Sequence, residues 1–450
     1  MPPVLHLNKE DIDTIEKRSK YEVCIVGCGN KAIHYALSFA GAGFKVKCTD
    51  ADQSMTKRLS RGNIRLASRE AEAKLKNFIK TENITASSEL KTAISTSDIV
   101  IINVKPKIDE NKCADFAEAW NMCKQIGTAL SKGALAVHVG IGAFGFVETV
   151  VKESLENTSG LKTGEDFALA YVYQNEFDYE EAAQFGDEEI YVAANDKFSL
   201  NSASLVFETI AKKGVRSVSG IRLAELASLF ASVKHDSNIA LANEFSCFCE
   251  AAAIDYVELT KSAGNTIDLP FLPSVSNEGY RSEPYLLLDS ADSLKVKLRM
   301  PLLARQINEE MVRHCVNLTQ EALRFGGKPL RRARVALLSG PLESSAVHEF
   351  VTMLENKGAK VILYGPFESG SEKTDETQIV KKNLNEAIEG TNCVVIFSPQ
   401  DQFKRLNLKK MHALMKSPTA LVDLTGLFEP SEVEEAGFIY RGLGRGVWKK

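Results

Sequence analysis

Residues 21–52 constrain the fold of this chain more than any other segment. An apolar run at 23–26 has strand character and leads into the glycine turn Gly27–Cys28–Gly29. Alanine and leucine then recur at helical spacing, Gly43 ends that helix, and residues 45–49 form a second strand. The order strand, glycine turn, helix and strand is typical of a β-turn-α-β unit, so we expect an α/β domain here.

The turn and the end of the second strand carry the residues that a dinucleotide requires. Gly27 permits the tight turn, Gly29 lets the backbone approach a pyrophosphate, and the small Ala32 keeps helix and strand close. Asp50 stands where an acid binds the ribose hydroxyls of adenosine, which favours NAD over NADP. We therefore predict NAD as the cofactor, with binding residues Gly27, Gly29, Asn30, Lys31, Ala32 and Asp50. The alternative is a Rossmann-like domain that no longer binds a dinucleotide, and Lys31 either crowds or assists the phosphates.

Further α/β alternation follows this unit. The apolar runs at 98–104, 134–139 and 167–173 are typical of buried parallel strands. The first domain is therefore expected to extend to about residue 215. The acidic stretch 180–189 is expected to form a solvated surface loop.

Residues 223–254 predict one long helix, because they are rich in alanine, leucine and phenylalanine and contain no glycine or proline. A helix this apolar must be buried between elements or between subunits. Ser228, Ser232 and His235 share one face of it, since they are four and three residues apart. His235 is a candidate base or anion contact, although a histidine on an apolar helix is more often structural.

A second α/β pattern begins after a linker at 326–329. Strand-like runs at 335–339, 360–363, 393–398 and 420–423 alternate with helical stretches that include 345–357 and 406–415. The chain thus predicts an α/β fold with two Rossmann-like parallel-sheet domains and a helical region between them.

Composition excludes several classes of protein. The net charge of -4 gives no basic surface for nucleic acid, and no apolar run reaches the roughly 18 residues of a membrane span. The N-terminus lacks the features of a signal peptide. The nine cysteines are scattered without a C-x-x-C pair. We therefore expect a cytoplasmic protein with no metal site.

Several short segments of the sequence indicate a protein family. Ala224–Glu225–Leu226 and the run 238–244 resemble the central helix of the nucleotide-sugar dehydrogenases, which oxidise UDP-glucose, UDP-N-acetylmannosamine or GDP-mannose to uronic acids. Residues 299–308 are similar to the next helix of that family, residues 283–287 to the segment after its catalytic loop, and residues 437–446 to its tail. The first twenty residues and the C-terminal tail resemble those of archaeal members of the family.

The resemblance implies a domain order. Residues 1–20 would be an N-terminal arm, 21–215 the NAD-binding Rossmann domain, 216–328 a central helical dimerisation domain, and 329–450 the domain that binds the nucleotide sugar. The implied partners are a UDP- or GDP-linked sugar and a second subunit, which is either another copy or an active paralogue.

The family's mechanism uses a cysteine thiolate, a lysine and an asparagine on the central helix, an aspartate after the cysteine, and a threonine and a glutamate from the first domain. This chain departs at most of these positions. The match places Gly279 at the cysteine, Ser228 at the lysine, Ser232 at the asparagine and Ile141 at the threonine. Glu283 stands for the aspartate, and Glu176 could retain the glutamate. The glycine-rich loop before the cysteine has become 274–278, which is poor in glycine.

Two interpretations follow. In the first, an NAD-dependent oxidoreductase acting on CH–OH groups survives with altered catalysis, and Glu176, Glu283 and His235 are its acid-base candidates. In the second, the chain binds NAD or a nucleotide sugar without catalysis and acts as the partner or regulator of an active dehydrogenase. The changed catalytic loop favours the second.

Overall fold

The computed structural model describes residues 3–64, 66, 68–174, 189–263, 275, 283–340, 345–365, 379–400 and 402–446. The chain forms two compact units, Met1–Ser232 with Tyr285–Lys297 and Val233–Pro284 with Leu298–Lys450. Each unit is built around one large β-sheet, so the predicted α/β class with two Rossmann-like sheets is confirmed. The helices of the predicted central region, 216–328, are divided between these two units.

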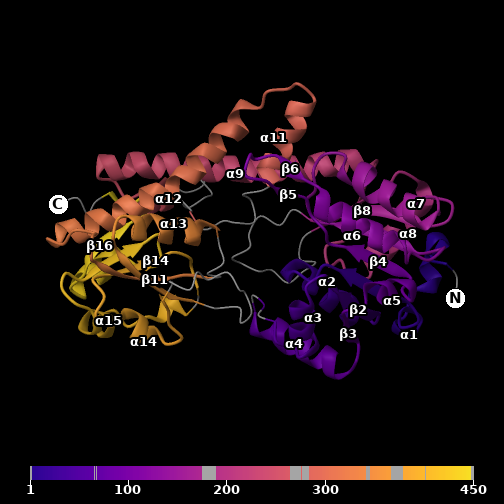
Figure 1. The fold of residues 1–450 in the computed structure, drawn as a ribbon, viewed down its shortest axis with the longest axis horizontal. Helices are drawn as coiled ribbons and strands as arrows, with labels where there is room; N and C mark the ends of the chain where they lie inside the picture. The colour runs from indigo at the N-terminus through magenta and orange to yellow at the C-terminus, as the bar shows by residue number, and fades with distance from the viewer. Residues whose placement is uncertain are drawn as a thin grey trace. The chain divides into compact units, whose positions relative to one another are not determined.

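The first unit contains an eight-stranded sheet in the order β10-β9-β8-β7-β4-β1-β2-β3 (Figure 1). Its strands are β1 (Glu22–Val26), β2 (Lys45–Thr49), β3 (Ile84–Ser87), β4 (Ile99–Ile102), β7 (Leu135–Val139), β8 (Ala168–Gln174), β9 (Ile190–Ala193) and β10 (Val215–Val218). The order reverses between β1 and β4, which is where open α/β sheets bind ligands. The sequence did not predict that β9 runs antiparallel to β8.

Helices cover both faces of this sheet, which explains why β4 is buried along its whole length. One face is covered by α2 (Asn30–Gly41), α4 (Arg69–Lys80) and α8 (Lys197–Glu208). The other is covered by α5 (Leu90–Ser95), α6 (Ala117–Gly127) and α7 (Glu153–Ser159). The helix α3 (Gln53–Ser60) follows β2 and packs beside β3.

The N-terminal segment before β1 packs against the first unit. It contains the short helices η1 (Val4–His6), η2 (Lys9–Asp11) and α1 (Ile15–Arg18). Val4, Leu5 and Leu7 are buried in the core of the first unit, and the Leu5 amide donates to the Gly133 carbonyl at 3.1 Å. Burial of these apolar side chains stabilises the attachment of the segment to the first unit.

The predicted long helix is α9 (Ile221–Ala252), which begins and ends two residues before the predicted bounds of 223–254. The other central helices are α10 (Tyr256–Ala263), α11 (Glu283–Ser293) and α12 (Arg299–Phe325). A small hairpin of β5 (Lys107–Ile108) and β6 (Ala114–Asp115) follows β4. The Lys112 ammonium of this hairpin donates to the Tyr285 hydroxyl of α11 at 2.6 Å, so the hairpin anchors α11 in the first unit.

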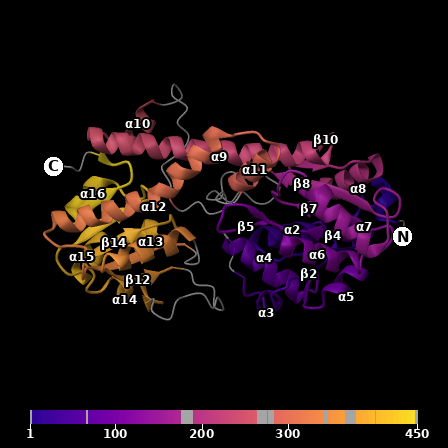
Figure 2. The ribbon, with the colours of Figure 1, turned by 45° about the horizontal axis from the view of Figure 1, so that its top comes forward.

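The second unit contains a six-stranded parallel sheet in the order β13-β12-β11-β14-β15-β16 (Figure 2). Its strands are β11 (Arg334–Leu338), β12 (Lys360–Tyr364), β13 (Ile379–Val380), β14 (Cys393–Ile396), β15 (Ala420–Asp423) and β16 (Ile439–Gly442). One face packs against α12 and α13 (Ser345–Asn356). The other packs against α14 (Leu384–Ile388), α15 (Leu408–Leu414) and α16 (Pro430–Glu435). Among the described residues, no helix is both long and apolar enough to cross a membrane.

Candidate functional site

The glycine turn after β1 has the geometry that a pyrophosphate requires. Gly27 has a φ of +89°, and a Cβ at this position would lie 2.5 Å from the carbonyl oxygen of Asn103. The Asn103 side-chain amide in turn donates to the Gly27 carbonyl at 3.1 Å. Any side chain at residue 27 would therefore displace the loop after β4, so glycine is needed for both conformation and space.

Gly29 is the N-cap of α2 and supplies no capping side chain, so the first amides of the helix are left to bind an anion. A Cβ on Gly29 would lie 3.7 Å from the Asn103 amide nitrogen, which is ordinary contact. The fold therefore tolerates a side chain there, whereas a close pyrophosphate would not. Asn30 and Lys31 begin α2, but their side chains lie outside the described residues. Ala32 is fully buried against the core, as its predicted packing role requires.

Asp50 lies at the end of β2, half-buried beside the turn. One carboxylate oxygen accepts the Cys28 amide at 2.6 Å, and the other accepts the Asp52 amide at 2.9 Å. Each oxygen of an ionised carboxylate can accept a second hydrogen bond. Asp50 can therefore hold the turn and still receive ribose hydroxyls. The glycine turn, the N-terminus of α2 and the Asp50 carboxylate together fit an NAD molecule.

Across the switch point, the loop after β4 meets the end of β7. The Lys105 Cε atom lies 3.7 Å from the point where a Cβ on Gly140 would stand. Below it, the His138 Nε2 atom lies 2.9 Å from the Val104 carbonyl oxygen. Burial lowers the pKa of His138 to about 4, the bond to Val104 opposes this, and the Lys105 charge adds to it. His138 is therefore neutral near pH 7, and Nε2 donates to Val104.

The row of stacked rings that begins at His138 leads to α9. The His138 and Tyr171 ring centroids are 5.7 Å apart with planes inclined by 17°, and the Tyr171 hydroxyl lies 2.9 Å from the Ser228 hydroxyl. Ser228 also donates to the Glu225 carbonyl at 2.8 Å. Ser228 is thus buried with its hydrogen bonds made inside the protein. Ser232, one turn later, is buried without a hydrogen-bond partner among the described residues.

Glu225 joins α9 to the segment after β7. Its two carboxylate oxygens accept the Gly145 and Val147 amides, both at 2.8 Å, at the start of the π-helical turn η3 (Val147–Lys152). The side chain is fully buried, and this burial raises the pKa of Glu225 to about 7 against the opposing effect of the two amides. Glu225 therefore fixes the loop that contains Gly140 and Ile141.

Two of the remaining predicted site residues, His235 and Glu283, are described on the helices α9 and α11. His235 is buried on α9, next to Asp236, whose carboxylate accepts from the Arg305 guanidinium at 2.5 Å and the Asn308 amide at 2.9 Å. Glu283 is buried at the start of α11. Glu176, Gly279 and the run 274–278, apart from Val275, lie outside the described residues, as does most of the acidic stretch 180–189. The structure thus places His235 and Glu283 without testing their predicted roles.

In the second unit, small polar residues line the sheet edge where the strand order reverses, between β11 and β14. The Ser339 and Ser398 hydroxyls lie 3.1 Å apart, and the Gly340 amide donates to Ser398. A Cβ on Gly365, after β12, would lie 2.5 Å from the Ser339 carbonyl oxygen. Three loops thus come together at this edge, where open α/β sheets bind their ligands.

Comparison with known proteins assigns the domains that carry the two sheet edges to one family. The NAD-binding domain of the UDP-glucose/GDP-mannose dehydrogenase family matches residues 21–188, and the UDP-binding domain of the same family matches residues 341–430. The chain belongs to the UDP-glucose/GDP-mannose dehydrogenase family. NAD is the cofactor for which its first domain is built.

Relatives of this family match along nearly the whole chain. The UDP-N-acetyl-D-mannosamine dehydrogenase of Pyrococcus horikoshii is 23% identical, with 94% of this chain and 99% of that protein covered. The UDP-glucose 6-dehydrogenase of Pseudomonas aeruginosa is 21% identical, with 94% and 97% covered. The solved structure of the UDP-D-ManNAc dehydrogenase of Pyrococcus horikoshii superposes with a TM-score of 0.77 over 95% of this chain and all of that one. The predicted family and the predicted resemblance to archaeal members are thereby confirmed.

Several contacts at the family's NAD edge were not predicted from the sequence. Asn103 closes the turn from the loop after β4, Lys105 lies over Gly140, and Glu225 holds the next loop. The strand predicted at 98–104 contains Asn103 near its end, and this position was the available signal. Nothing in the sequence pairs Glu225 with Gly145, because the two residues are 80 positions apart.

Proposed function

We propose that this chain binds NAD and a UDP- or GDP-linked sugar but does not carry out the four-electron oxidation to a uronic acid. The UDP-binding domain match and the position of Ser339 and Ser398 where the strand order reverses support the nucleotide sugar as ligand. Relatives named as UDP-ManNAc and UDP-glucose dehydrogenases support the same substrate class. The free thiols of all nine cysteines support a reducing compartment, the cytoplasm.

The environment of Ser228 carries the proposal. By resemblance, this position holds the lysine that stabilises the oxyanion, yet Ser228 is uncharged and its hydroxyl is engaged by Tyr171 and Glu225. The matched cysteine position is Gly279, which has no nucleophile to form a thioester. Loss of thiol and cation together removes both the covalent intermediate and its stabilisation.

Oxidation of the sugar C6 alcohol to the aldehyde is a two-electron step that needs neither the thiol nor the lysine cation. NAD, when bound, accepts the hydride in such a step, and a protein base must take the hydroxyl proton. The candidates remain Glu176, Glu283 and His235. Glu283 and His235 are both buried, and carboxyl and imidazole groups are the side chains that most often transfer protons in active sites.

The test is incubation of the purified protein with NAD and UDP-glucose, UDP-N-acetylmannosamine or GDP-mannose. NADH is followed by absorbance and products by mass spectrometry, with an active family member as positive control. We expect no uronic acid and at most one NADH per sugar, with the aldehyde trapped by hydroxylamine. Formation of uronic acid with two NADH per sugar would refute the proposal.

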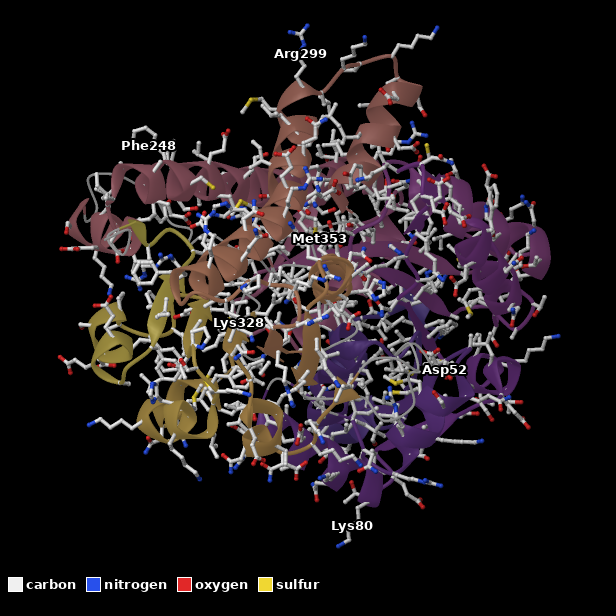
Figure 3. The ribbon with its side chains drawn as sticks, turned by 60° about the vertical axis from the view of Figure 1, so that its left-hand side comes forward. Asp52, Lys80, Phe248, Arg299, Lys328 and Met353 are labelled. Atoms are coloured by element: carbon white, nitrogen blue, oxygen red, sulfur yellow. The ribbon has the colours of Figure 1, made fainter. Side chains whose placement is uncertain are left out.

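The second candidate function is that of a non-catalytic partner subunit. Leu241, Phe245 and Phe248 recur along α9 with exposed fractions of 44%, 42% and 72%. Phe248 projects from the helix away from the rest of its unit (Figure 3). Met300 and Leu303 on α12 are 71% and 52% exposed. Apolar surface of this extent on two helices favours a subunit interface, so we propose a homodimer or a heterodimer with an active paralogue.

Native mass spectrometry after co-expression with an active family member distinguishes these two assemblies. The partner function requires a mixed dimer and a changed rate of sugar oxidation per active subunit. Exclusive homodimers would exclude the partner function and leave the two-electron enzyme.

A further inference from the structure

Lys105 occupies a distinctive place at the NAD edge of the first unit. It follows β4 by three residues, and its Cε atom packs above Gly140, the first residue after β7. The side chain is exposed at the carboxyl ends of these two strands. Lys105 therefore carries a positive charge at the edge of the sheet, on the far side of β1 from Asp50.

The topology divides a bound dinucleotide between the two halves of this edge. Asp50 at the end of β2 marks the adenosine half, and the turn after β1 marks the pyrophosphate. In a sheet made of two mononucleotide-binding halves, the other nucleotide lies beyond the switch point, over β4 and β7. Lys105 stands on that nicotinamide half.

The charge of Lys105 acts on this part of the molecule. It lowers the pKa of His138, after the larger effect of burial, because a cation disfavours a second positive charge nearby. The same argument applies to a ligand. NAD+ carries a positive charge on its nicotinamide ring and NADH carries none, while all their other groups are identical.

We propose that Lys105 makes this chain select NADH over NAD+, so that it responds to the reduced state of the cofactor pool. The proposal rests on the proposed cofactor site and deepens it. A non-catalytic or weakly catalytic member gains a function from this selectivity, since occupancy by NADH can then report on cofactor reduction. It concerns binding alone and requires no redox step on the protein.

The test compares the dissociation constants of NAD+, NADH and ADP-ribose, measured by calorimetry on the full chain. We expect Lys105→Met to lower the ratio Kd(NAD+)/Kd(NADH) roughly tenfold, the effect of unit charges about 6 Å apart at an effective dielectric constant of about 40. ADP-ribose, which lacks nicotinamide, should bind both proteins equally. Lys105→Arg should keep the ratio.

Lys107→Met is the matched control. Lys107 is an exposed lysine on β5 two residues away, and its ammonium forms an ion pair with Glu118. This variant should keep the ratio, and thermal unfolding should show that all three variants are folded. Raising the salt concentration from about 0.05 M to about 0.5 M should shrink the ratio of the unaltered protein, because salt screens an exposed charge.

Two results would overturn the inference and leave the cofactor site intact. One is an unchanged ratio in Lys105→Met. The other is an equal loss of affinity for NAD+, NADH and ADP-ribose, which would place the lysine on the shared pyrophosphate. If the unaltered protein binds none of the three ligands, the proposed cofactor function falls and takes this inference with it.

Discussion

Replacement of Glu225 by glutamine tests how α9 is joined to the loop beside the NAD edge. The Glu225 carboxylate is fully buried, and its two oxygens accept the Gly145 and Val147 amides at 2.8 Å. Glutamine keeps the shape and one acceptor, but its NH2 group faces the second amide. An unsatisfied buried amide costs about 1–3 kcal/mol, so the variant should be less stable at acidic pH by that order.

The pH dependence of this cost has a definite sign. Burial raises the pKa of Glu225 from 4.5 to about 7, so between these values the folded state holds a proton that the unfolded state has released. Stability contributed by Glu225 is therefore fully present below pH 4.5 and is lost as pH rises to 7. The loss amounts to about 3 kcal/mol. Glutamine does not titrate, so the stability of the variant lacks this dependence on pH.

The assay is the free energy of local opening at Gly145 and Val147, measured by hydrogen exchange at pH 5 and pH 8 in both proteins. Between pH 5 and pH 8, the difference between unaltered protein and Glu225→Gln should move by about 2.5 kcal/mol in favour of the variant, because part of the loss has already occurred at pH 5. Movement in the opposite direction would show that the two amides outweigh burial and hold the pKa of Glu225 below 4.5. A difference independent of pH would show that Glu225 titrates alike in both states.

Three further predictions concern the cofactor, assembly and chemistry. Asp50→Ala should raise the Kd for NAD about tenfold or more by calorimetry, since each hydrogen bond to a charged group contributes about 1.5–3 kcal/mol, and Gly29→Val should abolish binding without unfolding the domain. No heat from NAD or NADH with the unaltered protein would contradict the site. Light scattering should give a mass twice the 49.4 kDa of one chain, and a mass near 49.4 kDa at micromolar concentration would contradict the dimer. Gly279→Cys should not restore uronic acid formation, because Ser228 still supplies no cation and one missing oxyanion donor costs about a hundredfold in rate; recovery of product by this single change would contradict that reasoning.

Local pattern was sufficient for most of the fold. The strands β4 and β15 and the long helix α9 are predictable because their signals are continuous apolar runs or an uninterrupted helical composition. The glycine turn at Gly27 is predictable for the same reason, since its conformation depends on neighbouring residues. Its φ of +89° and the helix that follows are local consequences of a local sequence.

Long-range pairing was not predictable. The antiparallel pairing of β9 with β8 has no signal in the local sequence, and the contact between Glu225 and Gly145 depends on where α9 crosses the loop after β7. The N-terminal segment is largely polar in sequence, yet Val4 and Leu5 pack in the core because the sheet presents an apolar surface to them. A single sequence does not contain the distances that decide such contacts. The roles of Glu176, Glu283 and His235 stay predictions for the same reason.

The cofactor half and the chemical half of this family's site depend on different parts of the polypeptide. The pyrophosphate cradle consists of backbone amides and of space that glycines leave open, so it persists as long as Gly27, Gly29 and the fold persist. The chemical half consists of side-chain atoms, so one substitution is enough to remove each of them. Such a site can lose catalysis before it loses its ligand. The proposed function places Ser228 and Gly279 at two of these catalytic positions. Under that proposal the chain keeps the cofactor half of the site and is suited to report on a cofactor that it does not consume.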